Sequence, residues 1–267
     1  MNIPSELDYE THMIEYLPGT YGDFVCAIIS YSVDGFFDPC NPNWTAEEKY
    51  WRVRDNTALL RNKYPLSCRG SGYEHVEKYT EFMLGHKMFL DYPDFFKVEH
   101  DYKKIMFNTH MRMLDNNNYS THSRTNHNSF TKTKIKVLTI DTDFDSILMA
   151  CCNEYYTSTT DGIDETDYDH ILDKLRYTLK SQLWFKNNLT KEQILTIPNI
   201  MKLTPSDISC YGSVDKQKFD EYYKEYYSKK LKLLYRLTIK CKKAILETEH
   251  LKHKFESEYN NVIRENT

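Results

Sequence analysis

Apolar residues gather into two short runs near the start of the chain. Met13 to Leu17 forms the first run, the turn residues Pro18 to Gly22 follow, and Phe24 to Ile29 forms the second. The first run has the length of a short strand, whereas the second predicts a largely buried helix. We therefore expect a strand, a tight loop and a helix between residues 12 and 30.

A second unit of this kind lies further along the chain. Lys134 to Asp141 reads as a strand, and a helix with an apolar face follows at once. Lys104 to Asn108 predicts a short inner strand that ends at the polar tripeptide 108–110. Two strand-to-helix units favour a parallel sheet, so we expect one α/β domain over residues 1–267. The expected architecture is a three-layer sandwich whose central, mostly parallel sheet has internal strands around Ile14 and Leu138.

The remaining segments are mainly helical or polar. Helical signals cover 45–63, 73–88 and 168–185, and the polar stretch 115–133 predicts a flexible loop. The segment at about 214–265 carries apolar residues roughly 3.5 positions apart and predicts a long helix or a pair of helices. We prefer a helix laid across the sheet to a self-associating coiled coil, because Lys230, Thr248 and Glu258 interrupt the seam. Homo-oligomer formation through this segment stays open.

Composition narrows the functional classes. A net charge of -4 argues against a nonspecific nucleic-acid coat. The seven cysteines form no C-x-x-C pair, which favours reduced thiols. A polar N-terminus and the lack of a long apolar run predict a cytoplasmic protein that does not associate with a membrane. The many Asn, Lys and Ile residues fit an AT-rich viral or protist source, and a viral protein would act in the host cytoplasm.

The loop at Pro18 to Asp23 is the first candidate for chemistry. A helix that begins there would direct backbone N–H groups and its positive dipole end at an anion. The loop has no G-K-[ST], so a phosphate would rest on backbone groups and the Thr20 hydroxyl. We expect the loop to open into the main pocket. The alternative is that Pro18 and Gly19 only turn the chain and Asp23 only caps the helix.

Three pieces of the chain, LPGTYGDF, NTH and VLTID with its helix, resemble the sulfotransferase fold, especially divergent members from large viruses and phages. In that family the first strand, loop and helix hold the 5′-phosphosulfate of 3′-phosphoadenylyl sulfate (PAPS), typically with a pattern like Y-P-K-S-G-T-T-W. The resemblance implies that the nucleotide cosubstrate contacts Pro18, Gly19, Thr20, Tyr21, Gly22, Asp23 and Phe24. Gly19 stands at the position of the family's lysine.

The resemblance also implies a catalytic base and a second phosphate contact. NTH is similar to the K-T-H strand end of many members, which makes His110 the general base and leaves Asn108 in the place of lysine. The family's next strand ends in an arginine, with a serine further along, and both hold the 3′-phosphate. Asp141 stands at the arginine position, and Ser146 is the hydroxyl nearest to the serine position. Since an aspartate repels phosphate, positive charge must come from Arg112, Arg69 or Arg124.

These features support three hypotheses. The first is a PAPS-dependent sulfotransferase with an unknown hydroxyl or amine acceptor. The second is a catalytically degenerate relative that serves as a nucleotide-binding or protein-interaction module. The third, a P-loop phosphotransferase, is disfavoured by the missing G-K-[ST]. We predict no metal site, because the residues His110, Asp115, His122 and His127 match no compact ligand spacing.

Overall fold

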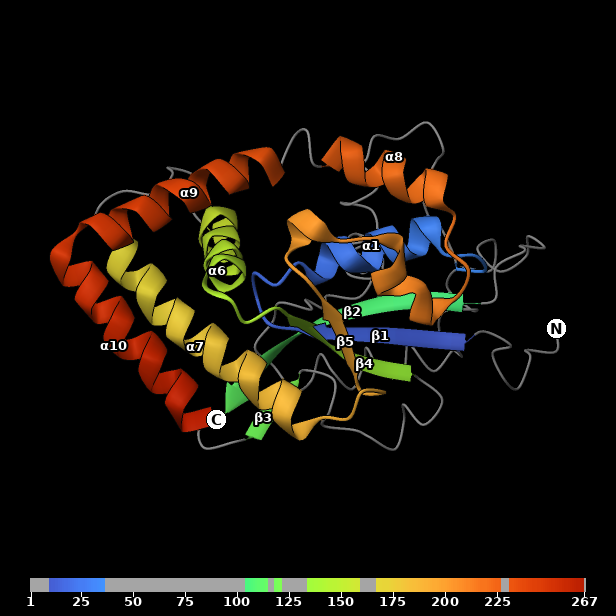
Figure 1. Ribbon diagram of the computed structural model, residues 1–267. Coiled ribbons are helices and arrows are strands. Elements are labelled where there is room, and N and C mark those ends of the chain that lie inside the picture. The colour runs from blue at the N-terminus through green and yellow to red at the C-terminus, as the bar shows by residue number, and fades with distance from the viewer. Residues whose placement is uncertain are drawn as a thin grey trace, which may run out of the picture.

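The computed structural model describes residues 10–36, 104–114, 118–121, 134–158, 167–226 and 231–266, and shows an α/β protein (Figure 1). The helices predicted at 45–63 and 73–88 lie outside these residues. So does most of the polar stretch 115–133, except for a short strand at its start.

The sheet has five strands in the order β3-β2-β1-β4-β5. Its members are β1 (Glu10–Tyr16), β2 (Lys104–Leu114), β3 (Asn118–Thr121), β4 (Lys134–Ile140) and β5 (Ile194–Ile197). β1 runs parallel to β2 and β4, β4 runs parallel to β5, and only β3 is antiparallel to its described neighbour. The predicted internal positions of the strands around Ile14 and Leu138 are therefore confirmed.

The central strands are buried on both faces. Met13 and Ile14 of β1 are fully buried although they point to opposite sides, as expected for a strand inside a parallel sheet. In β4, Val137 joins a small cluster with Leu17, Met111 and Phe185, whereas Leu138 belongs to the main core. The period of two along β4 thus separates two apolar clusters.

Two predictions about β2 and the polar stretch were wrong. The tripeptide 108–110 is not a strand end, because β2 continues to Leu114. Part of the expected loop forms β3 at Asn118–Thr121. The reason is pairing: residues up to His110 pair with β1, and Met111–Leu114 pair with β3. Backbone hydrogen bonds to β1 and then to β3 keep β2 extended beyond the polar tripeptide that had suggested the end of the strand.

The first helix, α1 (Gly22–Ser32), forms where the apolar run predicts it and is buried along most of its length. It packs against α8 (Lys216–Tyr226), with the Phe24 and Tyr222 rings 5.7 Å apart. Tyr223 also meets Phe24, at 6.2 Å. The tyrosines at 222 and 223 therefore pack α8 against α1.

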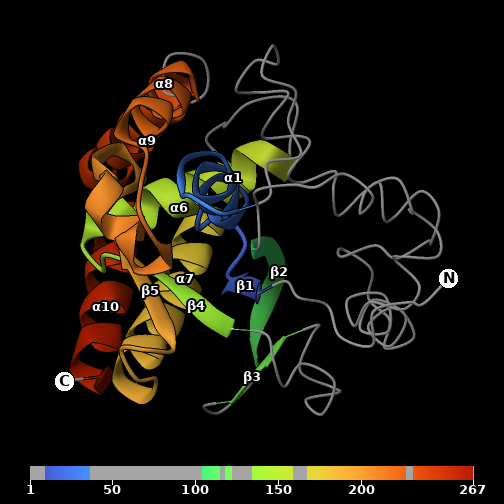
Figure 2. The same ribbon diagram turned by 90° about the vertical axis from the view of Figure 1, so that its right-hand side faces the viewer.

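The other long helices form a second group. They are α6 (Phe144–Ser158), α7 (Asp167–Asn188), α9 (Lys232–Glu247) and α10 (Glu249–Asn266). In Figure 1, these four lie together on one side, and α1 and α8 lie together on the other. Two short 3-10 helices, η2 (Ile200–Lys202) and η3 (Pro205–Tyr211), follow β5. In Figure 2, β3 and β5 mark the two edges of the sheet.

The C-terminal segment is helical, as predicted, but it contains three helices. α9 ends and α10 begins around Thr248, whose backbone is extended and whose carbonyl accepts the amide of Lys252. The predicted apolar seam packs inside the molecule, where Leu234, Cys241 and Leu251 are almost fully buried. α9 and α10 pack on α6 and α7, so the helix expected across the sheet is not found there.

Candidate functional site

The strand order of the sheet reverses between β1 and β4. β2, the next described strand after β1, lies on one side of β1. β4 lies on the other side of β1, and β5 continues the sheet beyond β4. In α/β sheets, ligands bind where the strand order reverses, outside the carboxyl ends of the strands. Here that place lies between the loop 17–21 after β1 and the turn 141–143 after β4, and we call it the carboxyl edge. Most of the residues implied by the resemblance lie at this edge.

The loop after β1 is held by its own backbone. The amide and the hydroxyl of Thr20 both donate to the Leu17 carbonyl, at 3.1 and 2.7 Å. Gly19 and Tyr21 have left-handed backbones, with φ values of 85° and 66°. Thr20 is fully buried. The single hydroxyl proton of Thr20 therefore points into the turn. The hydroxyl oxygen has only lone pairs left, and these cannot donate a hydrogen bond to an anion.

Helix α6 covers this loop. The Asn153 side chain donates to the Gly19 carbonyl at 3.0 Å. A Cβ atom on Gly19 would lie 2.3 Å from the Ala150 carbonyl oxygen and 2.9 Å from the Glu154 Cβ. A lysine at position 19 would need α6 to move, so the loop does not open freely on its α6 side. A shallow depression of about 470 Å³ lies instead along α8, between Lys216 and Lys224.

The start of α1 is shaped by Tyr16. A Cβ atom on Gly22 would lie 2.1 Å from the Tyr16 ring, so this glycine is required by close approach. The Tyr16 hydroxyl donates to the Asp23 carboxylate at 2.7 Å. Pro18 is half-buried, and Phe24 is 1% exposed within the core. Phe24 is thus a packing residue for α8.

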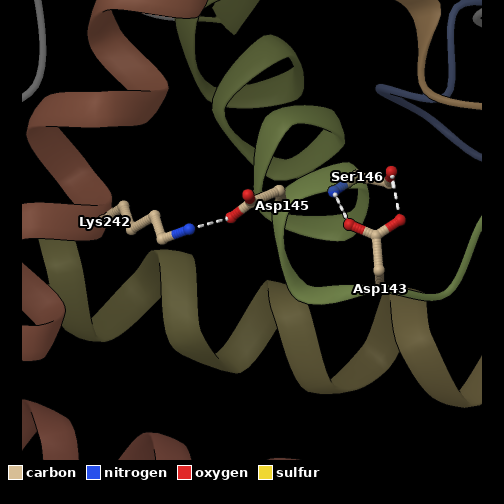
Figure 3. A network of polar contacts seen from close by, with 4 residues as sticks. All are labelled: Asp143, Asp145, Ser146 and Lys242. Atoms are coloured by element: carbon tan, nitrogen blue, oxygen red, sulfur yellow. Dashed lines mark hydrogen bonds and ion pairs between the residues drawn. The ribbon is translucent and has the colours of Figure 1, made fainter. Parts of the chain in front are cut away.

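The turn after β4 caps α6. Asp143 accepts the Ser146 amide at 3.0 Å and the Ser146 hydroxyl at 2.6 Å (Figure 3). Burial raises the pKa of Asp143, but these bonds and the charge of Lys202 outweigh it, so the net pKa is lowered. Ser146 is nearly buried, and its hydroxyl proton, like that of Thr20, is directed to an internal acceptor. Asp141 is exposed beside this turn.

Helix α10 also reaches the turn. The Tyr259 hydroxyl donates to the Thr142 carbonyl at 3.0 Å, and the Phe255 and Phe144 rings lie 4.3 Å apart. Burial and the nearby Asp143 carboxylate both raise the pKa of Tyr259. Helices from distant parts of the chain therefore close over both loops of the carboxyl edge.

Two lysines that sequence reasoning missed, Lys186 of α7 and Lys202 of η2, supply positive charge near the turn after β4. Gln182 of α7 accepts the Ile140 amide at 3.0 Å, which fixes this part of the helix at the end of β4. Lys186 follows one turn later. Burial lowers its pKa, and the carboxylates of Asp141 and Asp143 oppose that effect. Only the position of a glutamine one turn before a lysine could have suggested this placement, and that signal is weak.

The structure describes only some of the arginines proposed to supply positive charge, and only the backbone of the proposed general base His110. Arg112 lies in β2 opposite Ser120, and the side chains of Arg112 and His110 are outside the described features. Arg69 and Arg124 lie outside the described residues altogether. His110 pairs in register with Tyr16, the last residue of β1. Its backbone is therefore level with the start of the loop at the carboxyl edge.

Comparisons of this chain with models of protein families, with curated proteins and with solved structures found no match. Within the described residues, no three His, Cys, Asp or Glu side chains are grouped so as to hold a metal ion. The histidines at 122 and 127 fall outside those residues. No described helix has the length and apolar character needed to cross a membrane.

Proposed function

We propose that this chain is a catalytically degenerate sulfotransferase-like protein that acts as an interaction module. The proposal includes a three-layer sandwich with helices on both faces of the central sheet. One observation carries it: α6 packs against Gly19, at the position where the family's lysine would hold the leaving phosphate. Catalysis of this kind needs positive charge where negative charge develops, and this position has no room for it.

The hydroxyl groups support the same conclusion. Thr20 and Ser146 are the two hydroxyls that the resemblance assigns to the nucleotide, and both give their proton to an internal oxygen. Each oxygen then has only lone pairs left to offer, and an ionised phosphate has no proton to donate to them. Binding it would require both hydroxyl bonds to break, and the Asp143 carboxylate that accepts the Ser146 hydroxyl also caps α6 by accepting the Ser146 amide.

A second candidate is sulfuryl transfer from PAPS to an unknown hydroxyl or amine acceptor. Two observations favour it: His110 is level with the end of β1, and Lys186 lies near the turn after β4. In that reaction His110 takes the acceptor's proton, the acceptor atom forms a bond to sulfur, and the sulfur–oxygen bond to the nucleotide breaks. Adenosine 3′,5′-bisphosphate leaves.

Thermal unfolding in the presence of nucleotides separates the two candidates. A ligand at 100 times its Kd stabilises a protein by about 2.7 kcal/mol, which would raise Tm by about 5 °C for a chain of this size. We expect no such shift with PAPS, adenosine 3′,5′-bisphosphate or ATP at millimolar concentration.

A shift with PAPS would favour the enzyme. Lys186→Met should then reduce the shift, whereas Lys180→Met, on the exposed side of the same helix, should not. Turnover that falls about 100-fold or more in His110→Ala, with bisphosphate binding retained, would contradict the degenerate assignment.

A further inference from the structure

Helix α9 carries apolar side chains on its solvent side as well as on its packed side. Tyr235, Ile239 and Leu246 are 46%, 47% and 39% exposed. Together with Lys242 they are spaced four, three and four residues apart, which is the spacing of one seam of a coiled coil. We call these four residues the outer stripe. The buried residues Leu234, Thr238, Cys241 and Ile245 form a separate face that packs inside the molecule.

The one charged member of the outer stripe, Lys242, forms an ion pair with another helix of the same chain, at a partly exposed site. The Lys242 ammonium lies 2.5 Å from the Asp145 carboxylate of α6 (Figure 3). It also lies 5.7 Å from the centre of the Phe144 ring. Its charge is therefore turned towards the start of α6 and away from the other three residues of the stripe. The stripe can present an apolar seam despite the lysine.

The flank of the outer stripe is basic. Arg236 and Lys243 each follow a stripe residue directly, at the positions that carry interhelical ion pairs in coiled coils. Both are exposed, and the contact of Lys243 with Glu247, at 3.9 Å between two solvated side chains, holds it only weakly. Over the whole helix, five basic residues face one acidic residue, in a chain of net charge -4.

We propose that the outer stripe of α9 docks an amphipathic helix of a partner protein that carries acidic residues beside its apolar seam. Apolar contacts with Tyr235, Ile239 and Leu246 and ion pairs with Arg236 and Lys243 would hold it. The proposal rests on the assignment of the chain as an interaction module, although it uses a different surface from the carboxyl edge.

Charge complementarity selects this occupant over a second copy of the chain. In an antiparallel pairing of two α9 helices, the basic flank of one copy would lie along the basic flank of the other, and like charges in such contacts are unfavourable. A lipid surface is also a poor fit. One side of α9 is already packed on α6 and α10, so three partly exposed residues would have to support the insertion.

The test uses two labelled peptides of three heptads with leucine at both seam positions and either glutamate or lysine at the flanking positions. Fluorescence anisotropy with the full chain should give micromolar binding for the glutamate peptide and binding at least tenfold weaker for the lysine peptide. Glutamate flanks also prevent the peptide from pairing with itself near neutral pH. Raising the salt concentration should weaken binding, because the flanking charges are exposed.

A matched pair of variants tests the surface. Leu246 and Leu233 lie on the same helix and are equally exposed, at 39%, but Leu233 is about a third of a turn away from the stripe. Leu246→Ser should weaken binding of the glutamate peptide about tenfold, and Leu233→Ser less than twofold. The double variant Arg236→Glu, Lys243→Glu should prefer the lysine peptide.

Three outcomes would overturn the proposal: no binding of the glutamate peptide, equal losses in the two leucine variants, or binding only to phosphatidylserine vesicles. None of them bears on the nucleotide test, because that test measures the carboxyl edge. Conversely, a PAPS-dependent rise in Tm would show that the carboxyl edge binds a nucleotide, and the peptide measurements would still decide whether α9 docks a partner helix.

Discussion

Two separate constraints act on Gly19, and a second glycine in the chain carries only one of them. Gly19 and Gly35 have nearly equal left-handed backbones, with φ values of 85° and 81°. A Cβ atom would meet the Ala150 carbonyl at Gly19 but nothing within 4 Å at Gly35. The pair therefore separates backbone strain from packing within one protein.

We predict that Gly35→Ala lowers the free energy of unfolding by about 1–2 kcal/mol, the usual cost of a left-handed non-glycine residue. Gly19→Ala should cost about 3 kcal/mol or more, because α6 must also shift. Urea unfolding of both variants measures the difference. Equal losses would mean that α6 does not press on the loop, and the argument against a lysine at this position would fail.

Sequence reasoning reached the missing lysine but not its cause. The substitution at position 19 can be read from the loop itself, whereas the contact with Ala150 joins residues far apart in the chain. The same holds for Lys186, which approaches Asp141 only because Gln182 binds the end of β4. Asp143 could have been recognised as the cap of α6, since an aspartate directly before a helix accepts the amide three positions further on, here that of Ser146.

At the scale of single elements, the cap of α6 predicts a pH dependence. The pKa of Asp143 is lowered in the folded protein from its ordinary value of 3.8. A lowered carboxyl pKa contributes stability that is complete above the unfolded value and is lost as the pH falls through the folded value. The contribution of Asp143 should therefore be constant above about pH 5 and decrease below about pH 4.

Asp143→Asn tests this contribution. Asparagine still caps a helix, so the loss near pH 7 should be no more than about 1 kcal/mol. The difference from the natural chain should shrink in acid, as measured by urea unfolding between pH 3 and 7. Asp220→Asn, on the exposed side of α8, is the control. A difference that stays constant down to pH 3 would show that the carboxylate charge contributes nothing.

Element boundaries show where local patterns stop being informative. The strand at Lys134 was predicted to within one residue, because its apolar positions lie between clear polar ends. β2 was predicted six residues too short, since polar residues interrupt its second half and that half depends on β1 and β3 for pairing. The break at Thr248 was taken only as an interruption of a seam, because a threonine does not by itself end a helix.

At the scale of the whole molecule, the strand order predicts a gradient of local stability. β1 is hydrogen-bonded on both sides and buried, whereas β3 lies at an edge and spans four residues. Amides of Met13 and Ile14 should exchange with deuterium only through global unfolding, and those of β3 at least roughly a hundredfold faster. Hydrogen exchange resolved by residue checks this, and equal rates would contradict a central position for β1.

The central position of β1 also affects how the chain is made. β1 leaves the ribosome first, yet Glu10 pairs with Lys104 and His12 with Lys134. At typical synthesis rates of about 5–20 residues per second, the nascent strand waits on the order of 6–25 seconds for both neighbours. During that time apolar residues that later lie in the core are exposed to other chains. We therefore expect the yield of folded protein to rise when chaperones cover this first strand until β4 has been made, and co-expression with and without them would measure the effect.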